Sequence, residues 1–375
     1  MKKYMILCAS ALLALAACTK VAPVAETQHE IGFQVASYAT KANSALPEDT
    51  VFGAYSWYTN EAGTTVAQMT NEKVGKRGSE WKTIENTYYW PKTGSIDFIS
   101  YSPWMVNGPA EITAESLKFN AFKVGELDAN NGFKANGVDL MYADKALKQT
   151  QNGTEYVAVS NVTGGVPTLF HHALANVSFK IQANFLEWTD PQTQSKTTWK
   201  VTVKSAKLNG AYTQGDLALT STATAAAWTK PTDDVWTNLS APVAFDLISA
   251  EDGVALTSKA KGETPTDLSD FGFVIPQKLG DAQTLTLVMD IETTQPNKVT
   301  FTQPNVTRTV KLNTGKNGND AIAAWKMNQK IVYTILVKPT KGTNPDNPDD
   351  PTDDVITFDP AVAGWDEVLG ATIQL

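Results

Sequence analysis

The chain has 375 residues, of which 42% are hydrophobic and 19% are charged, and its formal net charge is -8 at pH 7. This length and composition predict two or three globular domains with buried cores and exclude a largely disordered chain. The charge is spread along the sequence without a basic stripe, which argues against nucleic acid as a partner. The ten Trp and eleven Tyr lie among short alternating runs, a composition that favours strands and turns over helices.

The amino terminus predicts export. In residues 1–17, Lys2 and Lys3 precede an apolar stretch that is too short to span a bilayer but suits a signal peptide. The small residues before Cys18 resemble the lipobox of bacterial lipoproteins, in which the cysteine is acylated and becomes the first residue. The alternative is an ordinary secretory signal that contains a cysteine. Acylation of Cys18 predicts a lipid anchor. Once Cys8 is removed and Cys18 is capped, no disulfide can form within the chain, so we expect its stability to come from hydrophobic cores.

A first strand is predicted soon after this segment, because Ile31, Phe33 and Val35 alternate with small or polar residues and so share one face. The same period of two recurs in "SIDFIS", "NVSFKIQ", "WKVTVKS", "LTLVMDI" and "KIVYTILV". Turn-forming residues separate these runs at the short spacing that is typical of antiparallel sandwiches. We therefore expect two antiparallel β-sandwich domains in series, at residues 42–165 and 166–338.

One stretch, "NDAIAAWKMNQ", predicts a short helix instead, with Asn319 or Asp320 as its N-cap.

The carboxyl terminus combines a spacer with a strand-forming segment. Residues 339–354 are rich in Asp and Pro and predict a flexible, extended linker, whereas residues 355–375 contain alternating apolar positions. This tail either adds the last strand to its own domain or donates a strand to another subunit's sheet. The linker prolines disfavour a compact return and so favour donation. The apolar positions of the expected donor strand are Ile356, Phe358, Val362, Trp365, Val368, Ile373 and Leu375.

Several motifs in order resemble the fimbrillin family, the lipoprotein-derived subunits of type V pili. They are "IGFQV…ATKA", "FGAYSWY", "YYWPKTGSIDFISYSP", "LFHHALANVSFKI", "FVIPQKL" and "WKMNQKIVYTILV". The resemblance implies transthyretin-like β-sandwich domains, export as a lipoprotein, proteolytic trimming and polymerisation by strand exchange. It implies that trimming removes the first strand and that another subunit's tail fills the resulting groove.

The resemblance also implies a cleavage site, with one departure. Such proteins are often cut after arginine, but no arginine precedes Arg77 here, and Lys41 occupies the equivalent place. Cleavage between Lys41 and Ala42 would release residues 18–41, with the lipid and the first strand. Without that cut the lipid would stay, as in an anchor or a non-polymerising surface protein. The simpler interpretation of Lys41 is an ordinary exposed lysine.

No motif predicts catalysis, a cofactor or a metal site. His171 and His172 are adjacent, so in a strand they point to opposite faces and cannot easily share a metal ion. The linker aspartates could bind calcium weakly, but they fit a solvated spacer better because no ligand loop accompanies them. One aromatic group could be a sugar platform or could serve core packing. Its members are Tyr88, Tyr89, Trp90, Tyr101 and Trp104.

The sequence therefore predicts a structural pilus subunit at the cell surface, made as an outer-membrane lipoprotein precursor and supporting adhesion. Its expected partners are other pilin subunits, a processing protease and a host or bacterial surface ligand. The alternative is a non-polymerising surface lipoprotein that keeps its lipid and binds glycan through exposed aromatic residues.

Overall fold

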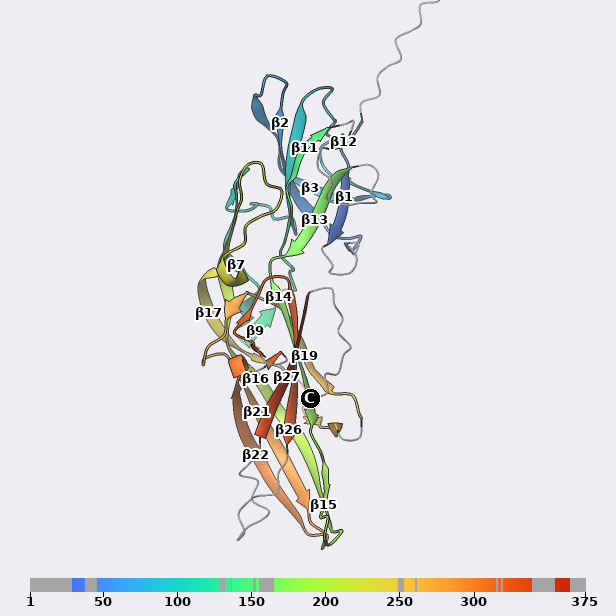
Figure 1. Cartoon of the computed structure of the whole chain (residues 1–375), viewed down its shortest axis with the longest axis vertical. Helices are drawn as coiled ribbons and strands as arrows, with labels where there is room; N and C mark the ends of the chain where they lie inside the picture. The colour runs from blue at the N-terminus through green and yellow to red at the C-terminus, as the bar shows by residue number, and fades with distance from the viewer. Residues whose placement is uncertain are drawn as a thin grey trace, which may run out of the picture.

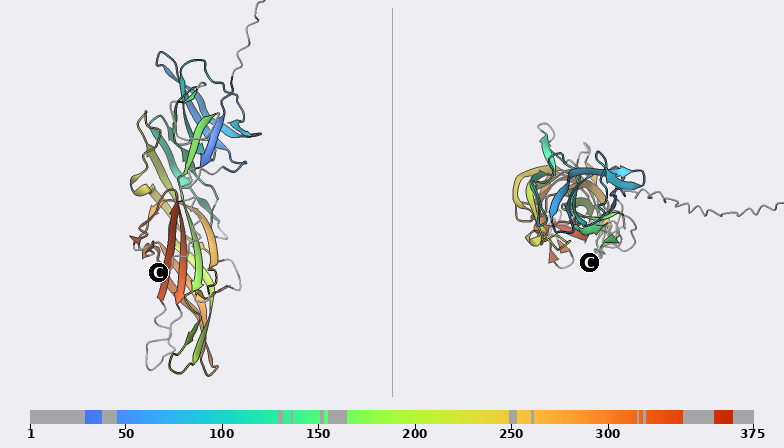
Figure 2. Two further views of the ribbon diagram at one scale, coloured as in Figure 1. Left: turned by 45° about the vertical axis from the view of Figure 1, so that its right-hand side comes forward. Right: turned by 90° about the horizontal axis from the view of Figure 1, so that it is seen from above.

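The protein is described here by a computed structural model covering residues 29–37, 46–128, 132–135, 137–150, 153–154, 165–248, 253–259, 262–314, 316–317, 320–338 and 355–364. Within these ranges the secondary structure is β-strand with two short 3-10 turns, Thr232–Asp234 and Leu312–Thr314. The molecule is elongated, with the amino-terminal strands in an upper lobe and the carboxyl-terminal strands in a lower lobe (Figures 1 and 2). The predicted all-β class is confirmed. No helix in the described ranges is long and apolar enough to cross a membrane.

The upper lobe is built on a nine-stranded sheet. β10 (Met141–Ala143) also pairs with β5 (Ser95–Ser102), so the sheet closes on itself around an aromatic core. The strands in spatial order are β10 (Met141–Ala143), β13 (Val166–His172), β1 (Phe33–Ser37), β4 (Glu80–Thr83), β3 (Thr65–Arg77), β2 (Phe52–Thr59), β5 (Ser95–Ser102), β11 (Ala146–Thr150) and β12 (Gly153–Thr154).

The lower lobe is a sandwich of two sheets. The larger, eight-stranded sheet runs β22 (Thr300–Lys311), β21 (Thr284–Thr294), β16 (Lys196–Thr220), β7 (Ser116–Lys123) and β6 (Glu111–Ile112), with β15 (Glu187–Thr189), β17 (Thr237–Asp246) and β18 (Val254–Ala255) paired to β16. The smaller sheet runs β19 (Thr266–Val274), β14 (Ala175–Ala183), β26 (Gln329–Lys338) and β27 (Val355–Gly364). Alternating residues of both sheets, such as Val177 and Phe179 on β14 and Leu285 and Leu287 on β21, meet in one core.

Three two-stranded pairs complete the fold. They are β8 (Gly125–Asp128) with β9 (Gly132–Ala135), β20 (Gln277–Lys278) with β25 (Ala324–Trp325), and β23 (Lys316–Asn317) with β24 (Asp320–Ala321).

A third core joins the lobes. Tyr101 from β5 and Leu117 from β7 pack there with Leu217 from β16 and with Trp236 and Met327. The strands are also interleaved across the expected domain boundary. β13 follows residue 165 but lies in the upper sheet, whereas β7 precedes it but pairs with β16 of the lower lobe. The domain boundary at residue 165 stays a prediction. Each lobe contains strands that precede residue 165 in the sequence and strands that follow it.

The helix predicted within residues 319–329 is wrong, because this stretch holds the short strands β24 and β25. Its backbone groups bond to other segments. The Ala323 carbonyl accepts from the Leu279 amide at 2.8 Å, and the Met327 amide donates to the Asp234 carbonyl at 3.0 Å. The Trp325 indole is buried and donates to the Tyr333 hydroxyl at 3.0 Å. These long-range partners override the local helix propensity of the alanines.

Candidate functional site

The first strand, β1, lies between β13 and β4. It pairs in parallel with β13 from Phe33↔Val166 to Ser37↔Phe170, but joins β4 through the single pair Phe33↔Trp81. The predicted strand is present, with its apolar face in the upper core. Ile31 is 1% and Phe33 is 4% exposed, and Val35 packs against the same cluster. Loss of β1 would therefore leave two unpaired strand edges beside an uncovered aromatic core.

Phe33 holds this face in place. Its ring makes edge contacts with Phe52 and Phe98, with centroids 5.5 and 5.8 Å away. Buried side chains of this kind each contribute about 1.5–3 kcal/mol, so the three residues that face the core contribute roughly 4–9 kcal/mol of gross burial. A strand that replaced β1 would need a comparable apolar face.

The residues just before β1 are tied down by polar contacts. The Ile31 amide donates to the Tyr88 carbonyl at 2.8 Å, and the Trp90 amide donates to the His29 carbonyl at 3.0 Å. The Glu30 carboxylate lies 3.1 Å from the Arg77 guanidinium and 3.0 Å from the Lys82 ammonium. Hydrogen bonds to Glu80 and then to Glu30 raise the pKa of Lys82. Sequence reasoning did not single out this cluster, because residues 30, 77 and 82 meet only in the folded sheet.

The expected processing and lipidation residues lie outside the described residues. Cys18, Lys41 and Ala42 belong to ranges that the structure does not describe. The next described residue is Leu46, which is buried in the upper core. The expected cut thus falls between two described segments, β1 on one side and the body of the lobe on the other.

The carboxyl-terminal strand β27 pairs with its own domain. It runs antiparallel to β26 through ten consecutive pairs, from Lys338↔Val355 to Gln329↔Gly364, and forms the outer strand of its sheet. Ile356, Phe358 and Val362 pair with residues of β26 that are buried in the core, Val337, Ile335 and Ile331. This arrangement is the self-pairing that the sequence left open. The other predicted donor residues, Trp365, Val368, Ile373 and Leu375, lie outside the described residues.

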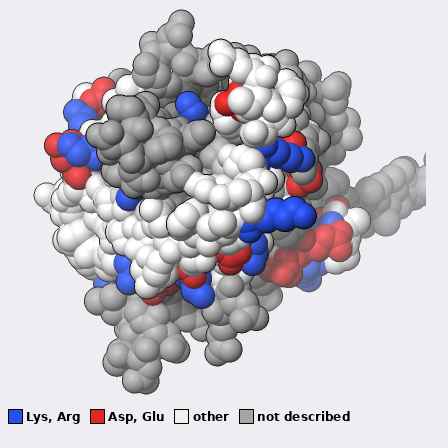
Figure 3. All heavy atoms as spheres, turned by 90° about the horizontal axis from the view of Figure 1, so that it is seen from below, with Lys and Arg blue, Asp and Glu red and all other residues white. Residues whose placement is uncertain are grey.

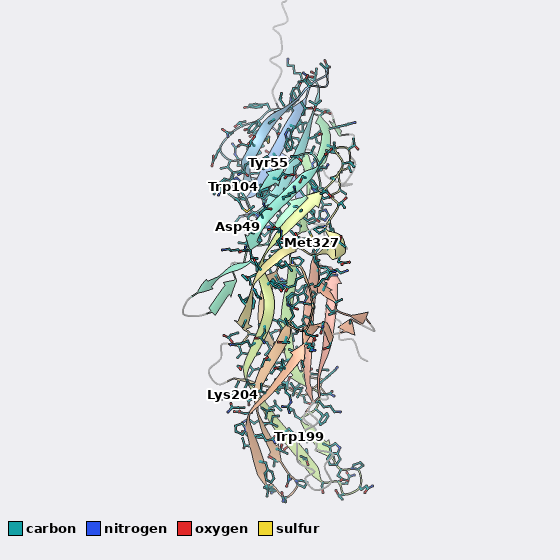
Figure 4. The ribbon with its side chains drawn as sticks, turned by 90° about the vertical axis from the view of Figure 1, so that its left-hand side faces the viewer. Asp49, Tyr55, Trp104, Trp199, Lys204 and Met327 are labelled. Carbon is teal, nitrogen blue, oxygen red and sulfur yellow. The ribbon has the colours of Figure 1, made fainter. Side chains whose placement is uncertain are left out.

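The aromatic residues considered as a sugar platform are dispersed. Tyr101 is buried in the core between the lobes, whereas Tyr88 and Trp90 pack on the upper core. Burial and then the neighbouring Glu72 raise the pKa of Tyr88 to about 12. Tyr89 is 44% exposed. Trp104 carries the Lys73 ammonium 4.9 Å from its ring centroid and lies in the upper lobe, as Tyr55 does (Figure 4). These contacts favour packing roles over one shared aromatic face.

The two histidines make separate polar contacts along β13. His171 Nε2 lies 3.1 Å from an Asp144 oxygen, and His172 Nδ1 lies 2.7 Å from an Asp139 oxygen. The His171 ring also stacks on Tyr142. Among the described residues, no three His, Cys, Asp or Glu side chains gather as a metal site would require.

Comparison with known proteins identifies the class. A model of the fimbrillin-like family matches residues 40–365, so the chain belongs to the fimbrillin-like family. The match begins after β1 and includes β27. A comparison with curated protein sequences finds no match.

One solved structure shares this fold, and two others match with lower scores. A fimbrial protein from Bacteroides vulgatus has a TM-score of 0.53 and 17% identity, covering 90% of this chain and 99% of that one. At this identity the similarity concerns the fold alone. A protein from Bacteroides uniformis assigned to cell adhesion has a TM-score of 0.45 and 15% identity, covering 91% and 99%. The tip fimbrial protein Mfa3 from Porphyromonas gingivalis has a TM-score of 0.33 and 13% identity, covering 90% and 100%.

Proposed function

We propose that this protein is a structural subunit of a fimbria at the cell surface, where its partners are other subunits and its filament supports adhesion. Export as a lipoprotein through Cys18 and trimming after Lys41 precede assembly. Strand exchange then joins the subunits, with the tail of one subunit replacing β1 of the next. Membership of the fimbrillin-like family supports the subunit role.

The observation that carries the strand-exchange step is the weak attachment of β1 on one side. A single residue pair joins it to β4, although its apolar face fills the upper core. Such a strand can leave after one cut without breaking the order of the other strands, and it leaves an apolar slot with free backbone groups on both sides. The outer position of β27, with no further strand beyond it in the described sheet, gives the tail only one pairing to break.

The experiment is limited digestion of the purified full chain with a lysine-directed protease, followed by intact mass and size-exclusion chromatography. We expect a cut after Lys41 and then a growing ladder of multimers. The Lys41→Ala variant is the matched control and should remain a monomer. A chain that lacks residues 355–375 should be cut but should form no ladder.

A ladder from the truncated chain would refute strand exchange through the tail. A stable monomer after complete cleavage at Lys41 would refute the step as well, and would mean that the pairing of β27 with β26 is its final state.

A further inference from the structure

One continuous segment links the two lobes along the long axis of the molecule. Residues 166–183 form β13 and β14, with only Ala173 and Leu174 between the two strands. Among the ladders of the described strands two are parallel, and this segment takes part in both. β13 pairs with β1, and β14 pairs with β26 through nine consecutive pairs that begin at Ala175↔Gln329. We call residues 166–183 the spine.

The joint between β13 and β14 is fixed in the core between the lobes, where Ala173 and Leu174 are fully buried. The Ala173 amide donates to the Leu140 carbonyl at 2.8 Å, and the Ala173 carbonyl accepts from the Trp236 indole at 2.9 Å. The Leu174 carbonyl accepts from the Asn328 amide, just before β26, at 3.0 Å. The spine is therefore tied to both lobes and to the upper end of β26.

A pull along the long axis loads the ladder between β14 and β26 at its two opposite ends. The two strands lie side by side along the lower lobe (Figures 1 and 2). An upward pull enters β14 at Ala175, through the upper lobe. β26 runs in the same direction and ends at Lys338, so a downward pull on residues 339–354 leaves it there. All nine pairs then share the load, whereas strands pulled at the same end separate one pair at a time.

The side chains of this ladder oppose sliding of one strand along the other. Phe179 lies directly opposite Tyr333, and their rings stack with centroids 5.3 Å apart. Both residues are buried, and the Tyr333 hydroxyl accepts from the Trp325 indole at 3.0 Å. Ile181 and Ile335 form the next buried pair on the same face. Sliding would separate these contacts together, so their summed attraction resists the pull.

The surface of the lower pole adds little strength of its own. Its described part is largely uncharged, with charged side chains near the rim, and exposed ion pairs of this kind are weak (Figure 3). β27, the strand proposed to leave its sheet, pairs in the described sheet only with β26. Once β27 has left, β14 is the one described strand that still pairs with β26, and tension at Lys338 passes through that ladder.

We propose that the spine bears the tension on a filament subunit and passes it to β26 across the parallel ladder, which is loaded in shear. This mechanical role rests on the filament function proposed above, but it is a property of each subunit by itself. The antiparallel ladders outside the spine, such as β16 with β21, lie off the path of the load.

The test pulls single molecules of the untrimmed chain through two introduced cysteines, in a background with Cys8→Ser and Cys18→Ser. Pro167→Cys, on the less buried face of β13, is the upper attachment in both geometries. With Lys338→Cys as the lower attachment, the ladder is loaded in shear. With Lys326→Cys, just before β26, the same ladder is pulled from its upper end. We expect a rupture force at least about twofold higher in the first geometry, because nine pairs instead of one oppose the pull.

Two matched core variants test the path of the load in the first geometry. Ile181 on β14 and Ile291 on β21 are buried in the same core at 0% and 1% exposure. Ile181→Ala and Ile291→Ala should therefore lower the urea midpoint similarly, which also checks that both variants fold. At a fixed force, Ile181→Ala should raise the rupture rate at least about tenfold, and Ile291→Ala less than about threefold.

Equal rupture forces in the two geometries would overturn the inference, as would equal rupture rates of the two isoleucine variants. Either result would leave the proposed assembly intact. Absence of multimers in the digestion experiment would instead overturn the proposed filament function, because the pulling experiment uses a monomer.

Discussion

Replacing Lys145 by Met should destabilise the contact between the two lobes and lower the free energy of unfolding. Lys145 follows β10 in the upper lobe and is 1% exposed. Its ammonium donates to the Ala114 carbonyl at 2.6 Å and to the Thr222 carbonyl, after β16 of the lower lobe, at 2.8 Å. It also lies 5.1 Å from the ring centroid of Trp228. The indole of Trp228 in turn donates to the Ala143 carbonyl at 2.9 Å. A segment of the lower lobe is thereby held against the upper one.

The magnitude follows from these contacts. Met has a similar length but no donor, so two carbonyls lose a partner at about 1–3 kcal/mol each, and a cation–π contact of about 1–2 kcal/mol is lost as well. Burial lowers the pKa of Lys145 because a charged group is costly to remove from water, and replacing the ammonium recovers part of the loss. We expect a net decrease of about 2–4 kcal/mol in the free energy of unfolding.

The assay is urea denaturation followed by tryptophan fluorescence. Lys207→Met is the control, because Lys207 pairs with Asp246 on the surface at 3.2 Å and should contribute less than about 1 kcal/mol. Hydrogen exchange should also become faster at the Lys145 amide, which donates to the Ala226 carbonyl at 2.9 Å. A Lys145→Met variant within about 0.5 kcal/mol of the original protein would refute the reasoning, because it would mean that water satisfies both carbonyls.

Two further predictions concern β1 and a bulge in the lower sheet. Phe33→Ala should lower the free energy of unfolding of the untrimmed chain by about 3–4 kcal/mol, because Phe33 is buried against Phe52 and Phe98. The same substitution should not change the stability of the polymer formed after cleavage, because β1 has then been removed. An equal decrease in the stability of the untrimmed chain and of the polymer would contradict removal of β1. Asp216 accepts from the Ala121 amide at 2.6 Å and from the Asn238 side chain at 2.7 Å, and these bonds lower its pKa. Since the folded pKa is depressed, this stabilisation is present above the ordinary value of 3.8 and is lost as the pH falls through the folded value. As the pH falls below 3.8, the thermal midpoint of the original protein should therefore drop by about 1–3 °C more than that of the Asp216→Asn variant. Equal decreases in the two proteins would contradict this role of Asp216.

The strands of this protein were predictable because a period of two needs only neighbouring residues. The runs around Ile96, Val177, Val201, Leu287 and Tyr333 all lie in strands, β5, β14, β16, β21 and β26. Alternation also correctly placed Ile31 and Phe33 on the buried face of the first strand. Local propensity misled at residues 319–329, where contacts with distant segments outweigh the preference of the alanines for a helix.

Alternation specifies a strand and its two faces but not its neighbour, because the neighbour is chosen by contacts far apart in the chain. The sequence by itself determined the all-β class, the apolar face of the first strand and the strand-forming tail. Only the tertiary structure decided that β27 pairs with β26, that β7 joins β16, and that Glu30 meets Arg77 and Lys82. Lys145 belongs to this second group as well, since the two carbonyls that bind its ammonium come from residues 31 and 77 positions away.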